Sequence, residues 1–248
     1  MAGWKRVVAV LGAAAALFAI AAGVFLGSIF GSFPTPQGAL VKSGQIVGVD
    51  TGGAYVWIVP TSDHGVVLID GGIDPDAIAV HEALFGRKVH AILLTHGHGD
   101  HVAGIGSFPD TPVYAGPGEL PLVRGDVLPK GLLAQVFARL MPRPAHPDLR
   151  EARNGELLTF DDQSFEVVHL PGHTAGSAAY LWGDVAFTGD SLLGHDGAVA
   201  PVHWVFADDY NQNLDSLRVL LKTDFERIAD GHAGVHDGAR KHLLELLK

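Results

Sequence analysis

The sequence predicts an α/β domain that is preceded by one apolar N-terminal helix. Three observations support this fold class. The chain has 248 residues, of which 48% are hydrophobic, and this is enough to bury the core of one domain. Short apolar stretches bounded by turn residues alternate with segments of helical pattern, which is typical of mixed α/β folds. A long uncharged run near the N-terminus stands apart from this pattern.

The N-terminal segment, residues 1–32, is predicted to be a membrane anchor or a signal sequence. Residues 7–30 carry no charge, and about 20 apolar residues span a bilayer. Lys5 and Arg6 precede this run and are expected to stay cytoplasmic, so the rest of the chain crosses the membrane. Ala19–Ala21 resembles a weak cleavage site, and a buried core helix is the third interpretation. We therefore expect a membrane-anchored, extracytoplasmic domain, or a secreted or periplasmic one after cleavage.

A Pro-containing stretch, residues 33–43, is predicted to link this segment to one folded domain at residues 44–248. Three apolar strands separated by turn residues open the domain, at Gln45–Val49, Ala54–Val59 and Gly65–Ile69. A helix is expected at Pro75–Phe85, because Asp74 is a suitable N-cap and proline suits the first helical position.

The rest of the domain repeats this order around one irregular segment. Short buried strands are expected at Ala91–Leu94 and Val113–Ala115. Residues 116–153 are Pro-rich and are predicted to be an insertion over one face, or a lid, with a short helix at Leu132–Met141. Further strands and two helices follow, at Phe165–Leu170, Ala178–Trp182, Val185–Thr188, Leu214–Leu221 and Arg240–Leu247.

The composition restricts the chemistry and the partners. The chain has no cysteine, so any transition metal must be held by His and carboxylate side chains. Without Lys5 and Arg6, 15 basic and 27 acidic residues leave the body with a net charge of −12. This charge disfavours nucleic acid, so we expect a small-molecule substrate. The sequence carries no signal for an oligomeric state.

The most informative stretch is Thr95–His101, which directly follows an apolar strand. It contains four side chains of ligand type, namely His96, His98, Asp100 and His101. Gly97 and Gly99 are expected to give the backbone the freedom for a tight turn that aims the side chains at one point. A run of solvated surface histidines is the alternative, but the glycines after a buried strand disfavour it. The stretch therefore predicts a metal site at a strand end.

Together with four other motifs, this stretch resembles the metallo-β-lactamase superfamily. The stretch matches the family signature His-x-His-x-Asp-His, and the other motifs occur in the family order at Leu68–Gly72, Pro171–Ser177, Phe187–Asp190 and Asp230–Gly234. The resemblance covers residues from about 45 to 248. It implies a four-layer αβ/βα sandwich, in which two sheets pack together and helices cover their outer faces.

The resemblance also implies how metal ligands are divided. The first metal would be held by His96, His98 and His173, and the second by Asp100, His101 and His232, with Asp190 bridging the two. Asp70 would support the site from behind a ligand, and Asp100 would also hold a proton during catalysis. Three neutral imidazoles are typical of catalytic zinc, so two Zn²⁺ ions are expected, with iron or manganese as alternatives.

Such a centre implies a hydrolase. Zinc lowers the pKa of bound water from 15.7 toward about 7, so we expect a metal-bridging hydroxide to attack an ester, lactone or thioester. Asp190 favours the glyoxalase II and lactonase branches, because the family's β-lactamases carry Cys or Ser there. Only 16 residues follow His232, so a glutathione thioester is not expected as the substrate.

Several alternatives stay open at this point. They are a mononuclear iron enzyme resembling persulfide dioxygenases, a phosphodiesterase or nuclease, a β-lactamase-like hydrolase, and a non-catalytic anchored metal-binding module. The presence of all seven ligand residues argues for two metals, and therefore against the iron enzyme and the non-catalytic module. The net negative charge argues against a nuclease.

Histidines outside the motifs receive weaker assignments. His195, His203 and Tyr210 follow the Asp190 motif and are candidates for protonating the leaving group. His169 is expected to pack or to support His173. The remaining histidines are expected at the surface, namely His64, His81, His90, His146, His236 and His242.

Overall fold

The structure is a computed structural model, and it describes residues 40–73, 86–141 and 143–248 together with Gly23, Val24, Gly27, Pro36 and Leu84. The chain divides into two compact units, Met1–Pro34 and Thr35–Lys248. The predicted membrane segment and most of the predicted helix Pro75–Phe85 lie outside the described residues, so both stay predictions. In the part of the chain that is described, no helix is long and apolar enough to cross a membrane.

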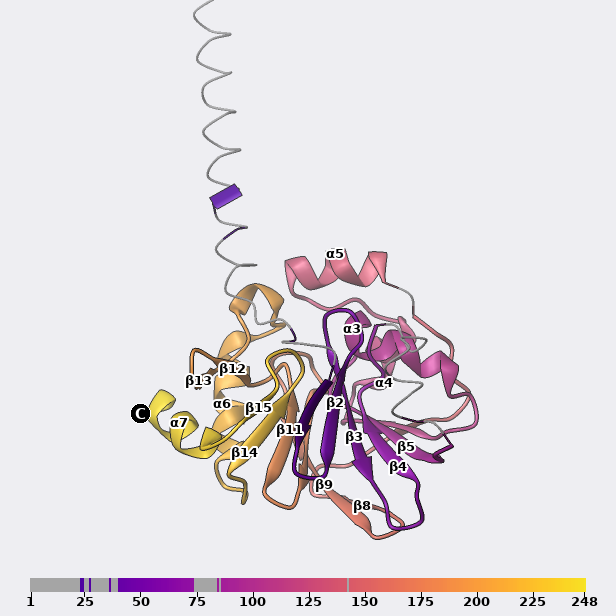
Figure 1. Ribbon diagram of the computed structural model, residues 1–248. Coiled ribbons are helices and arrows are strands. Elements are labelled where there is room, and N and C mark those ends of the chain that lie inside the picture. The colour runs from indigo at the N-terminus through magenta and orange to yellow at the C-terminus, as the bar shows by residue number, and fades with distance from the viewer. Residues whose placement is uncertain are drawn as a thin grey trace, which may run out of the picture. The chain divides into compact units, whose positions relative to one another are not determined.

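Two β-sheets pack against each other in the second unit (Figure 1). The first sheet contains, in spatial order, β1 (Leu40–Ser43), β2 (Ile46–Asp50), β3 (Tyr55–Pro60), β4 (Val66–Ile69), β5 (Val89–Leu94), β6 (Val113–Ala115) and β7 (Leu149–Glu151). Strands β1 to β4 pair antiparallel, whereas β4 to β7 pair parallel.

The second sheet contains, in spatial order, β15 (Val235–His236), β14 (Arg227–Asp230), β11 (Val185–Gly189), β10 (Ala178–Trp182), β9 (Gln163–His169) and β8 (Leu157–Phe160). The pair β11–β14 is parallel, and the other neighbours are antiparallel. A small separate sheet pairs β12 (Leu193–His195) with β13 (Ala198–Ala200).

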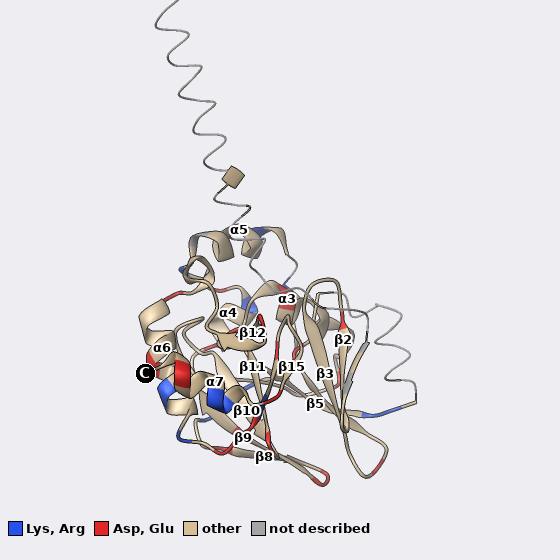
Figure 2. Ribbon diagram, turned by 60° about the vertical axis from the view of Figure 1, so that its left-hand side comes forward, with Lys and Arg blue, Asp and Glu red and all other residues tan. Residues whose placement is uncertain are grey.

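The helical elements are short and cover the sheets. Within the described residues they are α3 (Gly99–Val102), η1 (Ala103–Ser107), α4 (Leu120–Arg124), α5 (Leu132–Leu140), η2 (Trp204–Phe206), α6 (Tyr210–Leu220) and α7 (Ala239–Leu246), where η denotes a 3₁₀ helix. Charged residues lie mainly in loops and on outer helices such as α7, and the strands are largely free of them (Figure 2).

The alternation of side chains along the strands explains this layered arrangement. In β3, Tyr55, Trp57 and Val59 join the core between the two sheets, where they meet Phe187 and Tyr180 of the second sheet. The intervening residues of β3 face the opposite side and pack in a second apolar cluster with α3, η1 and α4. A third cluster joins the outer face of the second sheet to α6 and α7. This is the mixed α/β architecture that the sequence predicts.

The sequence prediction missed several short elements, namely β8, β12, β13, β14, β15 and α4, and it assigned two other strands to irregular segments. Leu40–Ser43, assigned to the linker, forms β1 and pairs with β2. Leu149–Glu151, assigned to the insertion, forms β7 and extends the first sheet beside β6. Both are short strands at a sheet edge and carry charged residues, so they lack the apolar run that marks a buried strand.

The hydroxyl of Tyr180 joins the two sheets and provides a test of this packing. It donates a hydrogen bond of 2.8 Å to the carbonyl oxygen of Leu94, and both residues are fully buried. Tyr180→Phe should therefore lower the free energy of unfolding by about 1–2 kcal/mol. Urea denaturation measures this change. Tyr114→Phe is the matched control, because its hydroxyl contacts Arg150 near the surface, and its effect should stay within about 0.5 kcal/mol.

Candidate metal centre

The predicted site residues lie at one edge of the two sheets. Strands β4 and β5 are parallel, and so are β9, β11 and β14, because β9 and β11 both run antiparallel to β10. Each of these strands is followed by a loop that carries a predicted site residue; the loops contain Asp70, Thr95–His101, His173, Asp190 and His232. The carboxyl ends of parallel strands share one edge of a sheet, and this brings residues far apart in the sequence together.

Hydrogen bonds across the sheets hold this edge closed. The backbone amide of Ala178 donates to the carbonyl of Thr95 at 2.8 Å, and the amide of Tyr55 donates to the carbonyl of Gly231 at 2.8 Å. The indole of Trp57 donates to the carbonyl of Asp230 at 2.9 Å. The loops that carry the site residues are therefore fixed to the neighbouring sheet as well as to their own.

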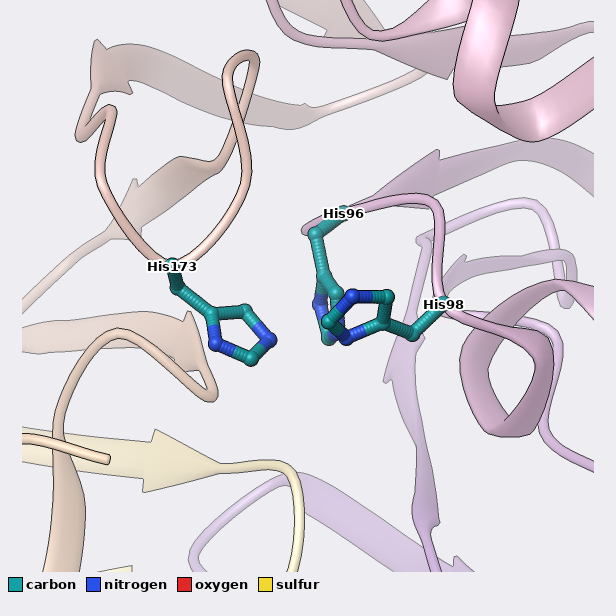
Figure 3. A group of neighbouring side chains, drawn as sticks. All are labelled: His96, His98 and His173. Atoms are coloured by element: carbon teal, nitrogen blue, oxygen red, sulfur yellow. The ribbon is translucent and has the colours of Figure 1, made fainter. Parts of the chain in front are cut away.

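Three imidazole rings converge from two loops (Figure 3). The ring centroids of His96, His98 and His173 lie 4.5–4.7 Å apart. Each ring offers one nitrogen to a group whose atoms all lie within 4.8 Å of one another, a spacing compatible with one shared metal ion. This group coincides with the first ligand set that the resemblance implies.

A second group lies beside the first and shares its carboxylate. Asp100, His101 and His232 form one set of converging atoms, and Asp190 forms another with His96 and His101. The Asp190 carboxylate lies 3.1 Å from His232 Nε2, 3.3 Å from His101 Nε2 and 3.8 Å from His173 Nε2. Asp190 therefore contacts ligand-type residues of both groups, as a bridging residue must.

In three of the histidine rings, Nδ1 lies close to a partner outside the cluster, and this partner orients the ring. His101 Nδ1 lies 2.8 Å from Asp70, and His232 Nδ1 lies 2.6 Å from the carbonyl oxygen of Gly53. His96 Nδ1 lies 3.1 Å from the hydroxyl of Thr95, which donates to Asp70 at 2.8 Å. Partners on Nδ1 fix the ring orientation and direct Nε2 into the cluster, as is usual for metal-binding histidines. Asp70 therefore lies where its predicted supporting role requires.

The unpaired atoms of the cluster fit a metal cation. Six buried atoms of the cluster have no hydrogen-bond partner within the described residues: Nε2 of His96, His98 and His101, both ring nitrogens of His173, and Oδ1 of Asp190. A buried polar atom without a partner costs about 1–3 kcal/mol. One or two divalent cations would satisfy the carboxylate oxygen and the imidazole nitrogens, since a bound metal replaces the protons of these rings.

The electrostatics divide the cluster into a neutral half and a charged half. Burial lowers the pKa of His96 and His173 well below the ordinary value, so their rings are neutral. Burial also acts on His232, but the Asp190 carboxylate outweighs it and raises the pKa to about 9. For His101, burial is opposed by Asp70 and Asp190, which raise its pKa well above the usual range. The carboxylates of this half thus attract positive charge, and a metal ion bound there would replace the protons of His101 and His232.

The glycines of the Thr95–His101 stretch act differently from the prediction. Neither Gly97 nor Gly99 has a positive φ, so left-handed freedom is not what the turn uses. Both are needed for space instead. A Cβ on Gly99 would lie 2.6 Å from Met141 Cβ, and one on Gly97 would lie 3.0 Å from a Glu119 carboxylate oxygen. The predicted reason for the two glycines, conformational freedom, is therefore wrong, and close packing takes its place.

Asp230 supports the loop of His232. It stands in the motif Asp230–Gly234, but no role was predicted for it from the sequence. Its side chain is fully buried, and Oδ1 accepts hydrogen bonds of 2.6–3.1 Å from the backbone amides of residues 232, 233 and 234. Its Oδ2 accepts a bond of 2.7 Å from Gly194 and lies 3.0 Å from His236 Nε2. Asp230 therefore holds the loop that presents His232.

The histidines outside the motifs are less exposed than predicted. The expectation of surface positions is wrong for His90, His146, His236 and His242, which are all partly buried, whereas His64 is exposed. His90 pairs with Asp63 at 3.0 Å and His236 pairs with Asp230, so partners that the sequence does not reveal draw these rings inward. His81 lies outside the described residues.

The three candidates for a proton donor lie in β12, at the start of η2 and at the start of α6. His195 is half exposed and lies 3.5 Å from Asp196. His203 caps η2 by accepting from the amide of Val205, and Tyr210 begins α6. Their role as proton donors stays a prediction. His169, in contrast, lies 3.1 Å from the carbonyl of Ala175 in the His173 loop, in agreement with the expected supporting role.

The segment 116–153, predicted to be an insertion or a lid, is attached to the loops around the cluster. The end of α5 lies against the cluster, because Met141 packs on Gly99. Its start is held by Asp208, whose carboxylate accepts from the amide of Lys130 at 2.5 Å and whose own amide donates to the carbonyl of His173 at 3.0 Å. Helix α5 is thus tied at its two ends to two of the loops that carry ligand-type residues.

The architecture and the cluster define a class of protein in which His and Asp side chains converge at the edge of two packed sheets. Residues 49–232 match the family model described as the metallo-beta-lactamase superfamily. The match covers most of the chain, and the chain therefore belongs to this superfamily, which confirms the family predicted from the sequence.

Curated relatives are named as hydrolases. The chain is 31% identical over 185 residues to the hydroxyacylglutathione hydrolase of Hamiltonella defensa subsp. Acyrthosiphon pisum, covering 72% of this chain and 61% of that protein. It is 32% identical over 143 residues to the corresponding protein of Aeromonas hydrophila subsp. hydrophila, covering 56% of this chain and 46% of that protein. The chain thus spans about half the length of these relatives. The family and these names are consistent with a metal-dependent hydrolase.

Solved structures share the fold. TTHA1623, crystallised in a di-iron-bound form, is 32% identical, with a TM-score of 0.59, and the match covers 77% of this chain and 93% of that one. The metallo-beta-lactamase SMB-1, bound to 2-mercaptoethanesulfonate, is 22% identical, with a TM-score of 0.65 and coverage of 86% and 94%. The second similarity concerns the fold alone.

The role of Asp230 can be tested through stability. In Asp230→Asn, an amide group would face backbone donors on one side of the side chain, so the free energy of unfolding should fall by about 1.5–3 kcal/mol. Chemical denaturation measures the change. Asp184→Asn is the control, because Asp184 forms an exposed pair with Arg227, and its effect should be below about 1 kcal/mol. Equal effects of the two substitutions would contradict the assignment.

Proposed function

We propose that this protein is a dinuclear metal-dependent hydrolase that cleaves a carbonyl ester-type bond, namely an ester, lactone or thioester. One observation carries the proposal. Two groups of converging ligand-type atoms lie side by side and share the Asp190 carboxylate. Two adjacent cations are the arrangement that hydrolases use to activate water and to polarise a carbonyl group.

The residues that would hold the metals follow from the two groups. His96, His98 and His173 would hold one ion, Asp100, His101 and His232 the other, and Asp190 would contact both. When bound, such ions supply a nucleophile at neutral pH and a Lewis acid for the scissile carbonyl oxygen. Zinc is the metal we propose, since three neutral imidazoles suit it. The di-iron form of TTHA1623 makes iron the second candidate.

The chain's own residues supply positioning and proton transfer. Asp70 fixes His101 through its Nδ1 and fixes the backbone of Thr95 at 2.7 Å. Asp100 is the carboxylate of the cluster with the most solvent access, since its side chain is 24% exposed, and it lies 3.7 Å from both His101 and His232. We therefore assign to Asp100 the proton that is released when water attacks and that the leaving group takes up.

Two features favour a carbonyl ester-type substrate over the alternatives. The curated relatives are hydroxyacylglutathione hydrolases, and this name denotes cleavage of a thioester. An aspartate occupies the bridging position, where the resemblance places Cys or Ser in true β-lactamases. A mononuclear iron enzyme would need only part of the cluster, whereas all seven side chains converge in this structure.

Removal of the metal tests the core of the proposal. Dialysis against a chelator should abolish hydrolysis, and added Zn²⁺ should restore it, because the catalytic nucleophile depends on the metal. His98→Ala and Asp190→Ala should each lower kcat/KM by at least about 100-fold. His64→Asn is the control, since His64 is exposed, lies outside the cluster, and has a φ of 65° that suits asparagine. Wild-type turnover by either cluster variant would refute the assigned centre.

A substrate panel separates the candidate reactions. We expect turnover of at least one of an aryl ester, a lactone and an S-acyl thioester, and less activity toward a phosphodiester or a cephalosporin. Metal analysis of the same sample should give two ions per chain. About one iron per chain together with oxygen consumption on a persulfide would instead support the dioxygenase alternative and contradict the hydrolase.

A further inference from the structure

Glu119 is a buried carboxylate that does not belong to the converging cluster. Its exposed fraction is 0%, and it directly precedes α4. Removing a carboxylate from water costs several kcal/mol unless hydrogen bonds satisfy its oxygens. The position of Glu119 therefore depends on the donors around it, and these donors come from two loops of the candidate metal centre.

Three donors bind the two oxygens of this side chain. Oε1 accepts from the amide of Gly97 at 2.6 Å and from the hydroxyl of Thr174 at 2.8 Å. Oε2 accepts from the amide of Gly176 at 2.7 Å. Gly97 stands between His96 and His98, and Thr174 follows His173, so one carboxylate links the loops that carry the three converging imidazoles.

The surroundings are built for this contact. Arg143 donates to the carbonyl of Gly97 at 3.2 Å and also to that of Leu122, so the Gly97 residue is held through both its amide and its carbonyl. Gly176 leaves no room for a side chain, because a Cβ there would lie 2.5 Å from the amide nitrogen of Glu119 and 2.6 Å from its Oε2. The Gly176 backbone and the Glu119 side chain are therefore in direct contact, and only glycine fits at position 176.

We infer that Glu119 is a positioning residue that sets the spacing between the His96–His98 loop and the His173 loop and so preorganises the three-histidine half of the centre. The inference rests on the proposed metal-binding function. Each oxygen faces a backbone N–H, so both must be acceptors, and charge-assisted hydrogen bonds of this kind are short and directional. Second-sphere contacts of this type tune metal affinity without touching the metal.

Zinc binding by Glu119→Gln tests the inference. The variant keeps the shape of the side chain, but its NH₂ group faces one of the two backbone amides. The hydrogen bond to that amide is therefore lost. We expect the affinity for one of the two zinc ions to fall by about 10–100-fold, measured by competition with a chromogenic chelator. The visible absorption spectrum of the Co²⁺-loaded protein should change as well, because the geometry of the three imidazoles changes.

Glu151→Gln is the matched control: Glu151 also accepts from a loop amide, that of Gly118 at 2.7 Å, but it is exposed and touches neither loop.

The outcomes separate the inference from the proposed function. A wild-type chain that binds no zinc or cobalt would overturn both. Two zinc ions in the wild type together with unchanged zinc affinity and cobalt spectrum in Glu119→Gln, even with lower thermal stability, would overturn the inference alone. If Glu119→Gln does not fold, Thr174→Val decides, since it removes one donor and keeps the carboxylate. Weaker zinc binding by that variant supports the inference, and wild-type binding contradicts it.

Discussion

Buried imidazole nitrogens and a buried carboxylate oxygen without hydrogen-bond partners lie at the edge where the two sheets meet, and the rest of the site is arranged around them. Such atoms destabilise a folded chain unless a partner satisfies them. The sequence places them there nonetheless, with neutral rings on one side and carboxylates on the other. A bound cation would satisfy these atoms. The surrounding structure must therefore hold their side chains at the positions that the cation requires.

Three buried carboxylates outside the two ligand groups provide that support. Asp70 holds His101 and the backbone before His96, Asp230 holds the loop of His232, and Glu119 links the loops of His96–His98 and His173. Each accepts several hydrogen bonds, of which at least one comes from a backbone amide, so each holds a loop in place. The loops at this edge are irregular in conformation, yet they are held at several points, as a preorganised site requires.

The sequence predicts the cluster better than its support. All seven side chains that converge were predicted: four stand in the motif Thr95–His101, and the resemblance to the superfamily implied His173, Asp190 and His232. Glu119 lies in a segment interpreted as an insertion, and its partners are backbone amides 22 and 57 residues away, which no local pattern reveals. The same reason explains His236, whose partner is a buried carboxylate. Strand existence was predicted well where apolar runs are long, as in β3, and missed for short edge strands such as β1 and β7.

Helix α5 is attached near the centre through its two ends, at Lys130 and Met141, while Val136 and Leu140 on the helix itself are 49% and 74% exposed. Substitutions along this helix can therefore alter the surface beside the centre and leave the ligand loops in place. The chain thereby separates the residues that are committed to metal chemistry from those that are free to diverge. Such a division lets one scaffold acquire new substrate preferences over evolutionary time without rebuilding its reactive core.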